Sequence, residues 1–545
     1  MQVQAKSLSD GDKRALAEFL GGQALDAMAS ASLPKCDAAR DRFDPGKPPV
    51  LDGWGFDAHN TRHISAGVAR LSIKEIPRLR LKWAFGFPTA TRARSQPTVA
   101  GETVFVGSQD GTVYAIDLAT GCVRWSFQAD AEVRSSPVVE SRMADGWNKG
   151  ALRVWFGDYR ANMYALEAAT GRLLWKHRVH PHPRATITGS PRYHAGRLYV
   201  PVSSTEWAAA ADPAYPCCSF QGSVVALDAT TGRIAWMGRS IESPVVAMRS
   251  GERTVSGPAG APIWNSPTID IRRGLLYVGT GEAYTSPASS TSDSVIAFDL
   301  ATGAQVWHYQ SIAGDAWNLA CFIGVQVNCP VENGPDLDIG ASPVLVTLKN
   351  GKQRLIAGQK SGNIFALDPD NGGRLLWRTK IGRGGIAGGV HWGLAARGEV
   401  IYAPVSDTVI KPEDAAQPGS PGLHALDVTT GRTIWFTPAP DACAPARKPA
   451  CDRGLSAPPT SIPGVVFAGS YDGHLRAYDE RSGRVIWDFD TARDFPVLGG
   501  GMGRGGSIES AGPVVIDGIV LVNSGYLWGG RMGGNLLLAF SVDGR

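Results

Sequence analysis

The sequence predicts an all-β protein, an eight-bladed β-propeller closed by an N-terminal strand and preceded by a short N-terminal helix. Three observations lead to this prediction. The 545 residues include 66 Gly and 16 Trp, both frequent, while charged residues make up only 19%. A meander of short alternating strands recurs along the chain. One such unit cannot bury both of its faces alone, so the units are expected to stack around a ring.

The repeat consists of an apolar run, a Gly-containing turn, a second apolar run that ends in an acidic residue, and then Gly-x-x-x-Trp. Residues 104–125 alternate with period two and have turns at Asp110-Gly111 and Thr120-Gly121, which is typical of antiparallel strands. We expect the acidic turn residues to bind backbone N–H groups and the tryptophans to pack between blades. The seven closing tryptophans are Trp125, Trp175, Trp236, Trp307, Trp377, Trp435 and Trp487.

The eighth unit lacks its closing strand at the C-terminus. Residues 514–524 and 535–540 supply inner strands, but the chain stops at Arg545 before any Gly-x-x-x-Trp can follow. Residues 79–85 hold an unpaired repeat tryptophan, Trp83. We therefore expect this N-terminal strand to complete the last blade, so that the ring has no exposed edge. The propeller then occupies residues 51–545 as one domain.

Charge and hydropathy exclude two classes of partner. Lys and Arg number 54 against 50 Asp and Glu, a formal charge of +4, which gives no footprint for nucleic acid or an anionic membrane. No stretch of about 18 apolar residues exists, so no membrane-spanning helix is expected. The eight cysteines indicate an oxidising compartment, and we expect a periplasmic location, although the start of the chain lacks the layout of a secretory signal.

The eight cysteines could form four disulfides. Cys217 and Cys218 are adjacent and could form an eight-membered disulfide ring, a rare structure that usually lines a site. Cys321 with Cys329 and Cys443 with Cys451 could each close a short loop, which leaves Cys36 and Cys122 as a possible pair. No Cys-x-x-Cys-His occurs, so this chain attaches no c-type haem, and zinc-type spacing is absent as well.

Chemically distinctive residues gather in inserts between the strands, where a rigid scaffold presents binding groups. Taken singly they could be a core tryptophan, a solvated acid or a surface lysine. They recur at like positions in successive blades, however, and the blades converge on one axis. Carboxylates, an amide, a cation and large aromatic rings suit a flat anionic cofactor held by a hard metal ion. The inserts contribute Glu206, Trp264, Glu282, Asp315, Asn318, Lys360, His391 and Trp392.

At these residues the sequence resembles the quinoprotein alcohol dehydrogenases, and among them the polyvinyl alcohol dehydrogenases. The resemblance runs from about Trp54 to the end and rests on four stretches, residues 53–62, 215–228, 357–362 and 523–526. Members of the family are eight-bladed propellers that hold pyrroloquinoline quinone (PQQ) and Ca²⁺ on the axis.

The resemblance implies a role for individual residues. Glu206 matches the metal-ligating glutamate, and Glu282 falls where another ligand follows Gly-Thr-Gly. Trp264 matches the tryptophan under the quinone ring, and Lys360 sits where a basic residue polarises a quinone carbonyl. The other cofactor contacts that we predict are Gln96, Arg134, Thr188, Cys217, Cys218, Asn318 and Trp392.

The chain departs from the family pattern at the catalytic base. Methanol-type relatives carry an aspartate after the tryptophan of Asp-x-Trp-Asp, whereas this chain reads Asp315-Ala-Trp-Asn318. An amide has no useful proton affinity near neutral pH. Either Asp315 takes the proton, which we favour, or Asn318 is a polar ligand and another group is the base. Ala320 stands where an extra aspartate would indicate a lanthanide, so we expect Ca²⁺.

Residues 1–50 are expected to be a helical remnant followed by a linker. Residues 8–20 have the pattern of an amphipathic helix with Ser9 as N-cap and Gly21 after its end. They resemble the last helix of a cytochrome c domain, although an ordinary terminal helix is the alternative. The resemblance implies that a haem-binding part and a signal peptide are missing upstream, and that a cytochrome c on another chain accepts the electrons.

The implied activity is oxidation of secondary alcohols to ketones, with poly(vinyl alcohol) as one candidate substrate. The alternative is a non-catalytic propeller scaffold of the outer-membrane assembly type. Such a scaffold shares the repeat but needs no axial carboxylates, no Cys-Cys pair and no long inserts. The enzyme hypothesis requires one set of residues to face a single axial pocket, namely Glu206, Glu282, Asp315, Lys360 and Trp264.

Overall fold

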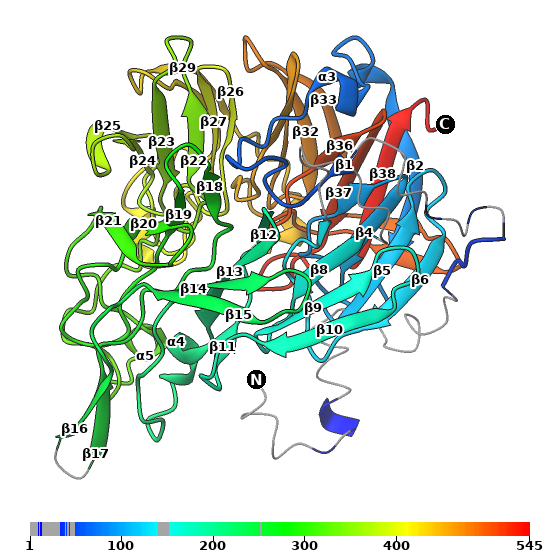
Figure 1. The fold of residues 1–545 in the computed structure, drawn as a ribbon. Helices are drawn as coiled ribbons and strands as arrows, with labels where there is room; N and C mark the ends of the chain where they lie inside the picture. The colour runs from blue at the N-terminus through cyan, green and yellow to red at the C-terminus, as the bar shows by residue number, and fades with distance from the viewer. Residues whose placement is uncertain are drawn as a thin grey trace.

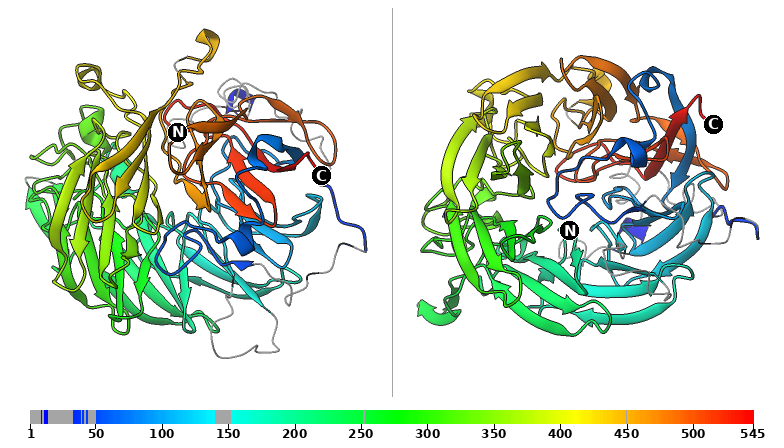
Figure 2. Two further views of the ribbon diagram at one scale, coloured as in Figure 1. Left: turned by 90° about the horizontal axis from the view of Figure 1, so that it is seen from above. Right: turned by 45° about the horizontal axis from the view of Figure 1, so that its top comes forward.

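Eight antiparallel sheets, each containing a meander of four strands, stand as blades around a central axis (Figures 1 and 2). This computed structural model describes residues 9, 11–13, 33–38, 40, 43, 50–139, 152–250, 253–448 and 450–545. The ring arrangement is clearest in the right-hand view of Figure 2. The predicted all-β, eight-bladed propeller is confirmed.

The first four blades follow one another along the chain. Blade 1 has an additional short strand, β1 (Val50–Leu51), which pairs with β3, and blade 3 has an additional strand, β11 (Ala185–Thr186), which pairs with the end of β13. Their meanders consist of β3 (Thr98–Ala100), β4 (Thr103–Gly107), β5 (Thr112–Asp117) and β6 (Val123–Gln128); β7 (Val138–Val139), β8 (Arg153–Gly157), β9 (Asn162–Glu167) and β10 (Leu173–Arg178); β12 (Arg192–His194), β13 (Arg197–Ser204), β14 (Ser223–Asp228) and β15 (Ile234–Arg239); β18 (Thr268–Asp270), β19 (Leu275–Gly279), β20 (Ser294–Asp299) and β21 (Gln305–Gln310).

The remaining blades continue in the same order, and the eighth takes one strand from the N-terminal region. They consist of β22 (Val344–Thr347), β23 (Gln353–Gly358), β24 (Asn363–Asp368) and β25 (Arg374–Lys380); β26 (Ala395–Arg397), β27 (Val400–Val405), β28 (Gly422–Asp427) and β29 (Thr433–Pro438); β30 (Thr460–Ile462), β31 (Val465–Gly469), β32 (His474–Asp479) and β33 (Val485–Asp490); β36 (Val514–Ile516), β37 (Ile519–Ser524), β38 (Leu536–Val542) and β2 (Leu79–Gly86).

Two hairpins and several single-turn helices lie outside the blades. The hairpins are β16 (Val246–Ser250) with β17 (Arg253–Gly257), and β34 (Asp494–Pro496) with β35 (Met502–Arg504). The helices are α3 (Ala66–Ala69), α4 (Glu206–Ala209), α5 (Leu319–Phe322) and α6 (Pro412–Ala415), together with the 3₁₀ turns η1 (Ile76–Arg78) and η2 (Pro445–Arg447). Among the described residues, no helix is long and apolar enough to cross a membrane.

The ring closes as predicted, by pairing of β2 with β38. The two strands run antiparallel, with Leu79 opposite Val542 and Gly86 opposite Leu536. The register shifts just before Trp83, as it does just before Trp175 in blade 2, so Trp83 occupies the position of a repeat tryptophan. The edge of β38 is therefore paired, and β2 supplies the outer strand that the eighth blade would otherwise lack.

The repeat tryptophans pack between neighbouring blades. Trp125 Nε1 donates to the Ala168 carbonyl of the next blade at 2.9 Å. Its ring lies against Gly171, where an added Cβ would come within 2.7 Å of the indole, and Gly171 has φ of +71°. A glycine is required there because both the space and the left-handed backbone exclude a side chain. The same relation joins Trp83 to Gly121, Trp175 to Gly232, Trp236 to Gly303, Trp307 to Gly373, Trp377 to Gly431 and Trp435 to Gly483.

The acidic turn residues have the structural role that was predicted. The Asp117 carboxylate accepts hydrogen bonds from the Thr120 backbone N–H at 2.9 Å and from its hydroxyl at 2.7 Å. Asp228 with Thr231 and Asp427 with Thr430 repeat this arrangement. These carboxylates are therefore used by their turns and are not candidates for catalysis.

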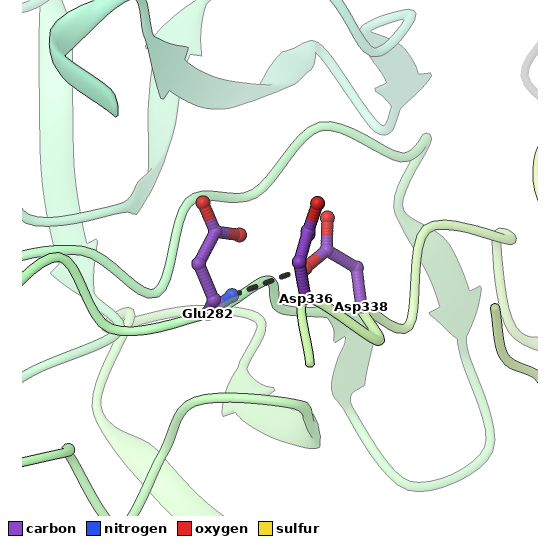
Figure 3. Close-up of side chains that lie close together, drawn as sticks. All are labelled: Glu282, Asp336 and Asp338. Atoms are coloured by element: carbon purple, nitrogen blue, oxygen red, sulfur yellow. Dashed lines mark hydrogen bonds between the residues drawn. The ribbon is translucent and has the colours of Figure 1, made fainter. Parts of the chain in front are cut away.

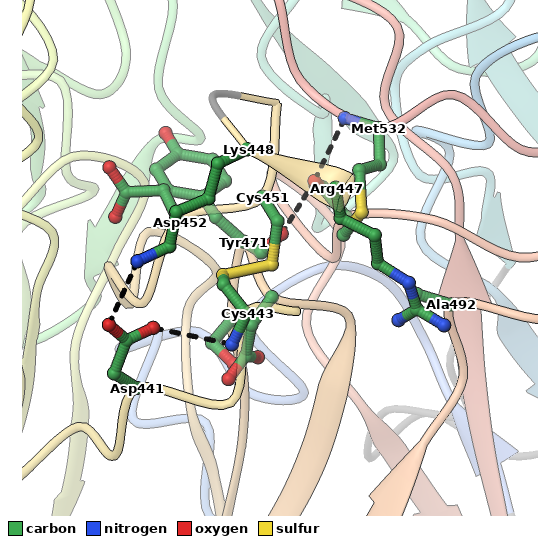
Figure 4. The surroundings of a disulfide bond; sticks show 12 residues. Asp441, Cys443, Arg447, Lys448, Cys451, Asp452, Tyr471, Ala492 and Met532 are labelled. Atoms are coloured by element: carbon green, nitrogen blue, oxygen red, sulfur yellow. Dashed lines mark hydrogen bonds and ion pairs between the residues drawn. A yellow bond between two sulfur atoms is a disulfide. The ribbon is translucent and has the colours of Figure 1, made fainter. Parts of the chain in front are cut away.

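All four predicted disulfides are present, and the described residues contain no free cysteine. Cys443 and Cys451 close a loop in which Lys448 Nζ lies 3.0 Å from the Asp441 carboxylate (Figure 4). Cys36 forms a disulfide with Cys122, which directly precedes β6, and so links the residues before the propeller to blade 1.

Residues 11–13 are helical, and Ser9 Oγ accepts from the Asp12 N–H at 3.1 Å, as an N-cap does. The rest of the predicted N-terminal helix lies outside the described residues, and its relation to a cytochrome c domain stays a prediction.

Candidate active site

Four inserted loops from blades 3 to 5 form a continuous hydrogen-bonded ladder. Gln221 pairs with Gly260, Gly260 with Ala283, and Ala283 with Ala316. Each of these four residues is a near neighbour in sequence of a predicted site residue. The ladder therefore brings together the loops that carry Cys218, Trp264, Glu282 and Asp315, which are far apart in the chain.

A cavity of about 360 Å³, part of it open to solvent, is lined mainly by residues of the loops that lead into the innermost strands of the blades. Its aromatic walls are Trp264 and Trp392, whose rings meet edge to face at 4.9 Å. Gly340 makes room for Trp264, because a Cβ there would come within 1.8 Å of the indole. Five of the predicted cofactor-binding residues line this cavity: Gln96, Arg134, Thr188, Trp264 and Trp392.

Two hydrogen-bond donors in the cavity lining have no partner among the described residues. Arg134 Nη2 and Thr188 Oγ1 are buried and unpaired. Burial lowers the pKa of the Arg134 guanidinium, which lies 4.3 Å over the Trp392 ring. Unpaired buried donors are costly, so these two groups indicate an anionic or oxygen-rich ligand in the cavity. Gln96 differs, because its amide is already bonded to the Trp54 carbonyl and to Arg62.

Lys360 is attached to the wall of the cavity through Asp338. Lys360 Nζ lies 3.0 Å from Asp338 Oδ2 and 2.9 Å from Asp336 Oδ1. The same Asp338 oxygen accepts a 3.0 Å hydrogen bond from Trp264 Nε1, and Lys360 Nζ lies 5.7 Å from the Trp264 ring centroid. Burial lowers the pKa of Lys360, but the two carboxylates outweigh it and raise the pKa above its usual range. The carboxylates therefore favour the charged form of Lys360 beside Trp264.

Glu282, Asp336 and Asp338 are the described acidic side chains that lie close enough to share one metal ion (Figure 3). Their ligand oxygens all lie within 4.8 Å of one another, and the Glu282 N–H donates to Asp338 Oδ1 at 3.2 Å. Burial and the neighbouring Asp338 carboxylate raise the pKa of Glu282 well above its ordinary value. Burial also raises the pKa of Asp293, whose two carboxylate oxygens have no partner among the described residues. The buried carboxyl groups of this region therefore outnumber the single positive charge that Lys360 supplies.

Glu206 is not part of this group of three. It is the first residue of α4, and its carboxylate accepts hydrogen bonds from the backbone N–H groups of Ser219 and Phe220, the latter at 2.7 Å, and from Tyr215 Oη at 3.0 Å. Burial alone would raise its pKa, but these bonds and His182, 3.4 Å away, hold the pKa below the ordinary value. The carboxylate is therefore engaged with the segment that carries Cys217 and Cys218.

Asp315, the favoured base, and Asn318, which replaces the aspartate of the family pattern, face different partners. Asp315 is buried and accepts from the backbone N–H groups of Asp336 at 3.3 Å and Leu337 at 3.1 Å, so it orders the loop that carries the acidic residues. Burial raises its pKa. Asn318 instead lies beside the vicinal disulfide, with Nδ2 3.9 Å from Cys217 Sγ. Cys217, Cys218 and Asn318 do not line the cavity. Of the five residues expected to face one axial pocket, only Trp264 lines this cavity, whereas Glu206, Glu282, Asp315 and Lys360 do not.

Sequence reasoning missed four acidic residues of this region, Asp293, Asp336, Asp338 and Glu509. Asp336 and Asp338 alternate in Pro335-Asp-Leu-Asp-Ile339 directly before the Gly340-Ala-Ser-Pro turn, a signal that could have been read. Glu509 accepts hydrogen bonds from Trp392 Nε1 at 3.0 Å and from Tyr471 Oη at 2.9 Å. It fixes the second aromatic wall of the cavity, and no local pattern in the sequence marks it.

A cavity walled by tryptophans with two unpaired donors in its lining, and a buried lysine and carboxylate cluster joined to Trp264 through Asp338, define a propeller of the cofactor-binding class. Comparison with known proteins identifies the family. The profile described as "Glucose/ethanol/alcohol dehydrogenase, beta-propeller domain", designated PQQ, matches residues 53–380, more than half of the chain. A second profile, "Outer membrane protein assembly factor BamB", matches residues 360–516. The chain belongs to the PQQ-dependent alcohol dehydrogenase family.

Individual relatives support this assignment. The chain is 38% identical to a polyvinylalcohol dehydrogenase of Pseudomonas sp. over all of this chain and 87% of the relative. It is 40% identical to a polyvinylalcohol dehydrogenase of Sphingopyxis sp. (strain 113P3), over 94% of this chain and 79% of the relative. Quinohemoprotein alcohol dehydrogenase ADHIIG from Pseudomonas putida HK5 has the same fold, with a TM-score of 0.68 at 19% identity over 94% of this chain and 83% of its own. The predicted family resemblance is confirmed.

Proposed function

We propose that the protein oxidises secondary alcohols to ketones with PQQ and Ca²⁺, and that a cytochrome c on a separate chain accepts the electrons. Poly(vinyl alcohol) is a candidate substrate, because two relatives that cover most of this chain are named for it. The observation that carries the proposal is the pair of unpaired donors, Arg134 and Thr188, in a cavity walled by Trp264 and Trp392.

The cavity residues fit the quinone. PQQ is flat and carries carboxylates, so aromatic walls suit its faces and the free Arg134 and Thr188 donors suit its anionic rim. Lys360 would supply a fixed positive charge near a ring carbonyl. When bound, the quinone supplies a two-electron acceptor.

The acidic group fits a hard cation. Ca²⁺ takes carboxylate oxygens as ligands, and Glu282, Asp336 and Asp338 offer one each within a shared space. Buried carboxylates in excess of the available cations must be protonated or bind a cation. We therefore propose Glu282 as a Ca²⁺ ligand together with Asp336 and Asp338. Glu206, the other ligand predicted from the resemblance, lies outside this group and stays a prediction.

The reaction needs one base from the protein. Conversion of a secondary alcohol to a ketone removes the hydroxyl proton and the C–H hydrogen with its electron pair. Asp315 stays the candidate for the proton, because burial raises the pKa of its carboxyl and so increases its proton affinity. Lys360 and the bound cation would oppose the negative charge that develops on oxygen.

The decisive experiment is reconstitution of the purified chain with PQQ and Ca²⁺. We expect quenching of tryptophan fluorescence on addition of PQQ, and dye reduction that depends on 2-butanol or poly(vinyl alcohol) more than on ethanol. Reduction of added cytochrome c tests the acceptor. Absence of both the spectral change and dye reduction would overturn the enzyme proposal and leave the scaffold as the better explanation. A periplasmic location, which we propose from the four disulfides, is tested by cell fractionation.

A further inference from the structure

The side chain of Asn318 is fully buried and all of its hydrogen-bonding groups are used. Its Oδ1 accepts from the Ala320 N–H at 3.0 Å and caps α5. Its Nδ2 donates to the Tyr284 carbonyl at 3.1 Å and to the Asn328 carbonyl at 2.7 Å. An amide nitrogen has two N–H groups, so both are occupied by carbonyl oxygens.

Asn328 continues the connection toward the vicinal disulfide. Its own Nδ2 donates to the carbonyls of Ala210 at 3.0 Å and Asp212 at 2.9 Å, in the segment between α4 and Cys217. Asn328 also directly precedes Cys329, which is bonded to Cys321. The two asparagines therefore join the disulfide-closed loop 321–329 to the segment that leads into the Cys217–Cys218 pair.

The opposite side of the same segment is held by Glu206. Its carboxylate binds the N–H groups of Ser219 and Phe220, directly after Cys218. The chain is thus held by Asn328 before the Cys217–Cys218 pair and by Glu206 after it. Asn318 Nδ2 lies 3.9 Å from the Cys217 sulfur. Because the ladder of loops joins this segment to the one that carries Trp264, movement of the disulfide would reach the wall of the cavity.

We propose that Asn318 is a positioning residue, which holds the Cys217–Cys218 disulfide and the 321–329 loop in place beside the ladder of loops that carries Trp264, and that it takes no part in proton transfer. The proposal rests on the proposed function. It explains why asparagine stands where the family pattern has an aspartate. A carboxylate at this position would place buried negative oxygens against the carbonyls of Tyr284 and Asn328, and could donate to neither.

The test is N318D, which changes the chemistry of the side chain with little change of shape. The control is N333D, the same exchange at an exposed position of the following loop. We expect N318D to raise the Kd for PQQ by about tenfold or more, measured by tryptophan quenching. We also expect faster alkylation of Cys217 and Cys218 under mild reduction, measured by mass spectrometry, and no gain in alcohol turnover. N333D should match wild type in all three measurements.

A second variant covers the case in which N318D fails to fold. N328A removes the bonds to the Ala210 and Asp212 carbonyls and should produce the same combination of weaker PQQ binding and faster alkylation. A gain in turnover by N318D, or unchanged alkylation in both variants, would overturn the proposal. If the wild-type chain binds no PQQ, the proposed function fails, while the alkylation rates still decide the role of Asn318.

Discussion

Trp264 Nε1 donates to Oδ2 of Asp338 at 3.0 Å, and this oxygen also lies 3.0 Å from Lys360 Nζ. One carboxylate therefore orients an aromatic wall of the cavity and neutralises the cation beside it. The other carboxylate oxygen of Asp338, Oδ1, accepts a hydrogen bond from the Glu282 N–H at 3.2 Å. Asp338 is therefore also bonded to another residue of the candidate metal site. Asp338 connects the three components from which the site is built.

The first prediction concerns this carboxylate. D338A leaves the buried Lys360 with Asp336 alone and Trp264 Nε1 without an acceptor, so we expect the apparent free energy of unfolding to fall by about 3 kcal/mol. Urea unfolding followed by fluorescence measures this loss. The control is D494A, which breaks the exposed ion pair with Arg504 and should cost less than about 1 kcal/mol. Equal losses would mean that Asp338 has no special structural role.

The second prediction separates binding from stability at Arg134. This buried guanidinium has an unpaired Nη2, so R134M removes a buried charge together with an unsatisfied N–H group. We expect the apoprotein to be as stable as wild type or more stable, while the Kd for PQQ rises about a hundredfold, because a charge-assisted contact is lost. Fluorescence titration and thermal melting measure the two effects. A parallel loss of stability and affinity would contradict the assignment of Arg134 to the ligand. R78M, at an exposed arginine, is the matched control.

The third prediction is the pH dependence of the metal-free protein. Burial raises the pKa of Glu282, Asp293 and Asp336 well above the ordinary values. Between the ordinary pKa and the raised one, the folded chain keeps protons that the unfolded chain has released. The stability contribution of these groups is therefore present at low pH and lost as pH rises through that interval. Asp338 has a lowered pKa and acts in the opposite sense, but only below its ordinary value.

Ca²⁺ should remove this loss, because it binds the deprotonated carboxylates. We expect unfolding in a chelator to become easier from pH 5 to pH 8, and 1 mM Ca²⁺ to restore stability most at pH 8. E282Q should have a flatter pH dependence and a smaller response to Ca²⁺, since it can neither release a proton nor donate a charged ligand. A stability that is independent of Ca²⁺ at pH 8 would exclude a cation site at Glu282.

The fold could be predicted in detail because its determinants are local in the sequence. Trp125 and the preceding Gly121 mark a strand and its turn without knowledge of any distant residue. Trp83 indicated the ring closure because it was a repeat tryptophan with no unit of its own. The packing partners of seven tryptophans follow from the repeat, since each faces an equivalent glycine turn of the next blade, whereas Trp487 bonds to Leu79 of the closing strand.

The site was less predictable because its interactions join residues from different blades. The approximate location of Trp264 and Lys360 could be inferred, but not the carboxylate that links them. Lys360 pairs with Asp336 across 24 residues, and neither residue belongs to a repeated position. The environment of Gln96 was also hidden, because Arg62 and the Trp54 carbonyl occupy its amide. Asn318 could be recognised as a departure from the family pattern. The Tyr284 and Asn328 carbonyls that bind its amide could not be predicted, because they come from separate loops.

The last prediction tests the seam of the ring. Trp83 is buried, donates from Nε1 to the Leu118 carbonyl at 3.1 Å, and packs against Gly121 of blade 1. W83A removes this contact between the closing strand and the first blade, and we expect a loss of about 3–5 kcal/mol in apparent unfolding free energy. The control is W528A, whose ring is 50% exposed and should cost less than about 1 kcal/mol. W125A removes the equivalent contact between blades 1 and 2. If W83A and W125A are equally destabilising, the seam is as strong as an ordinary blade interface, whereas a much smaller effect of W83A would show that β2 contributes little to closure.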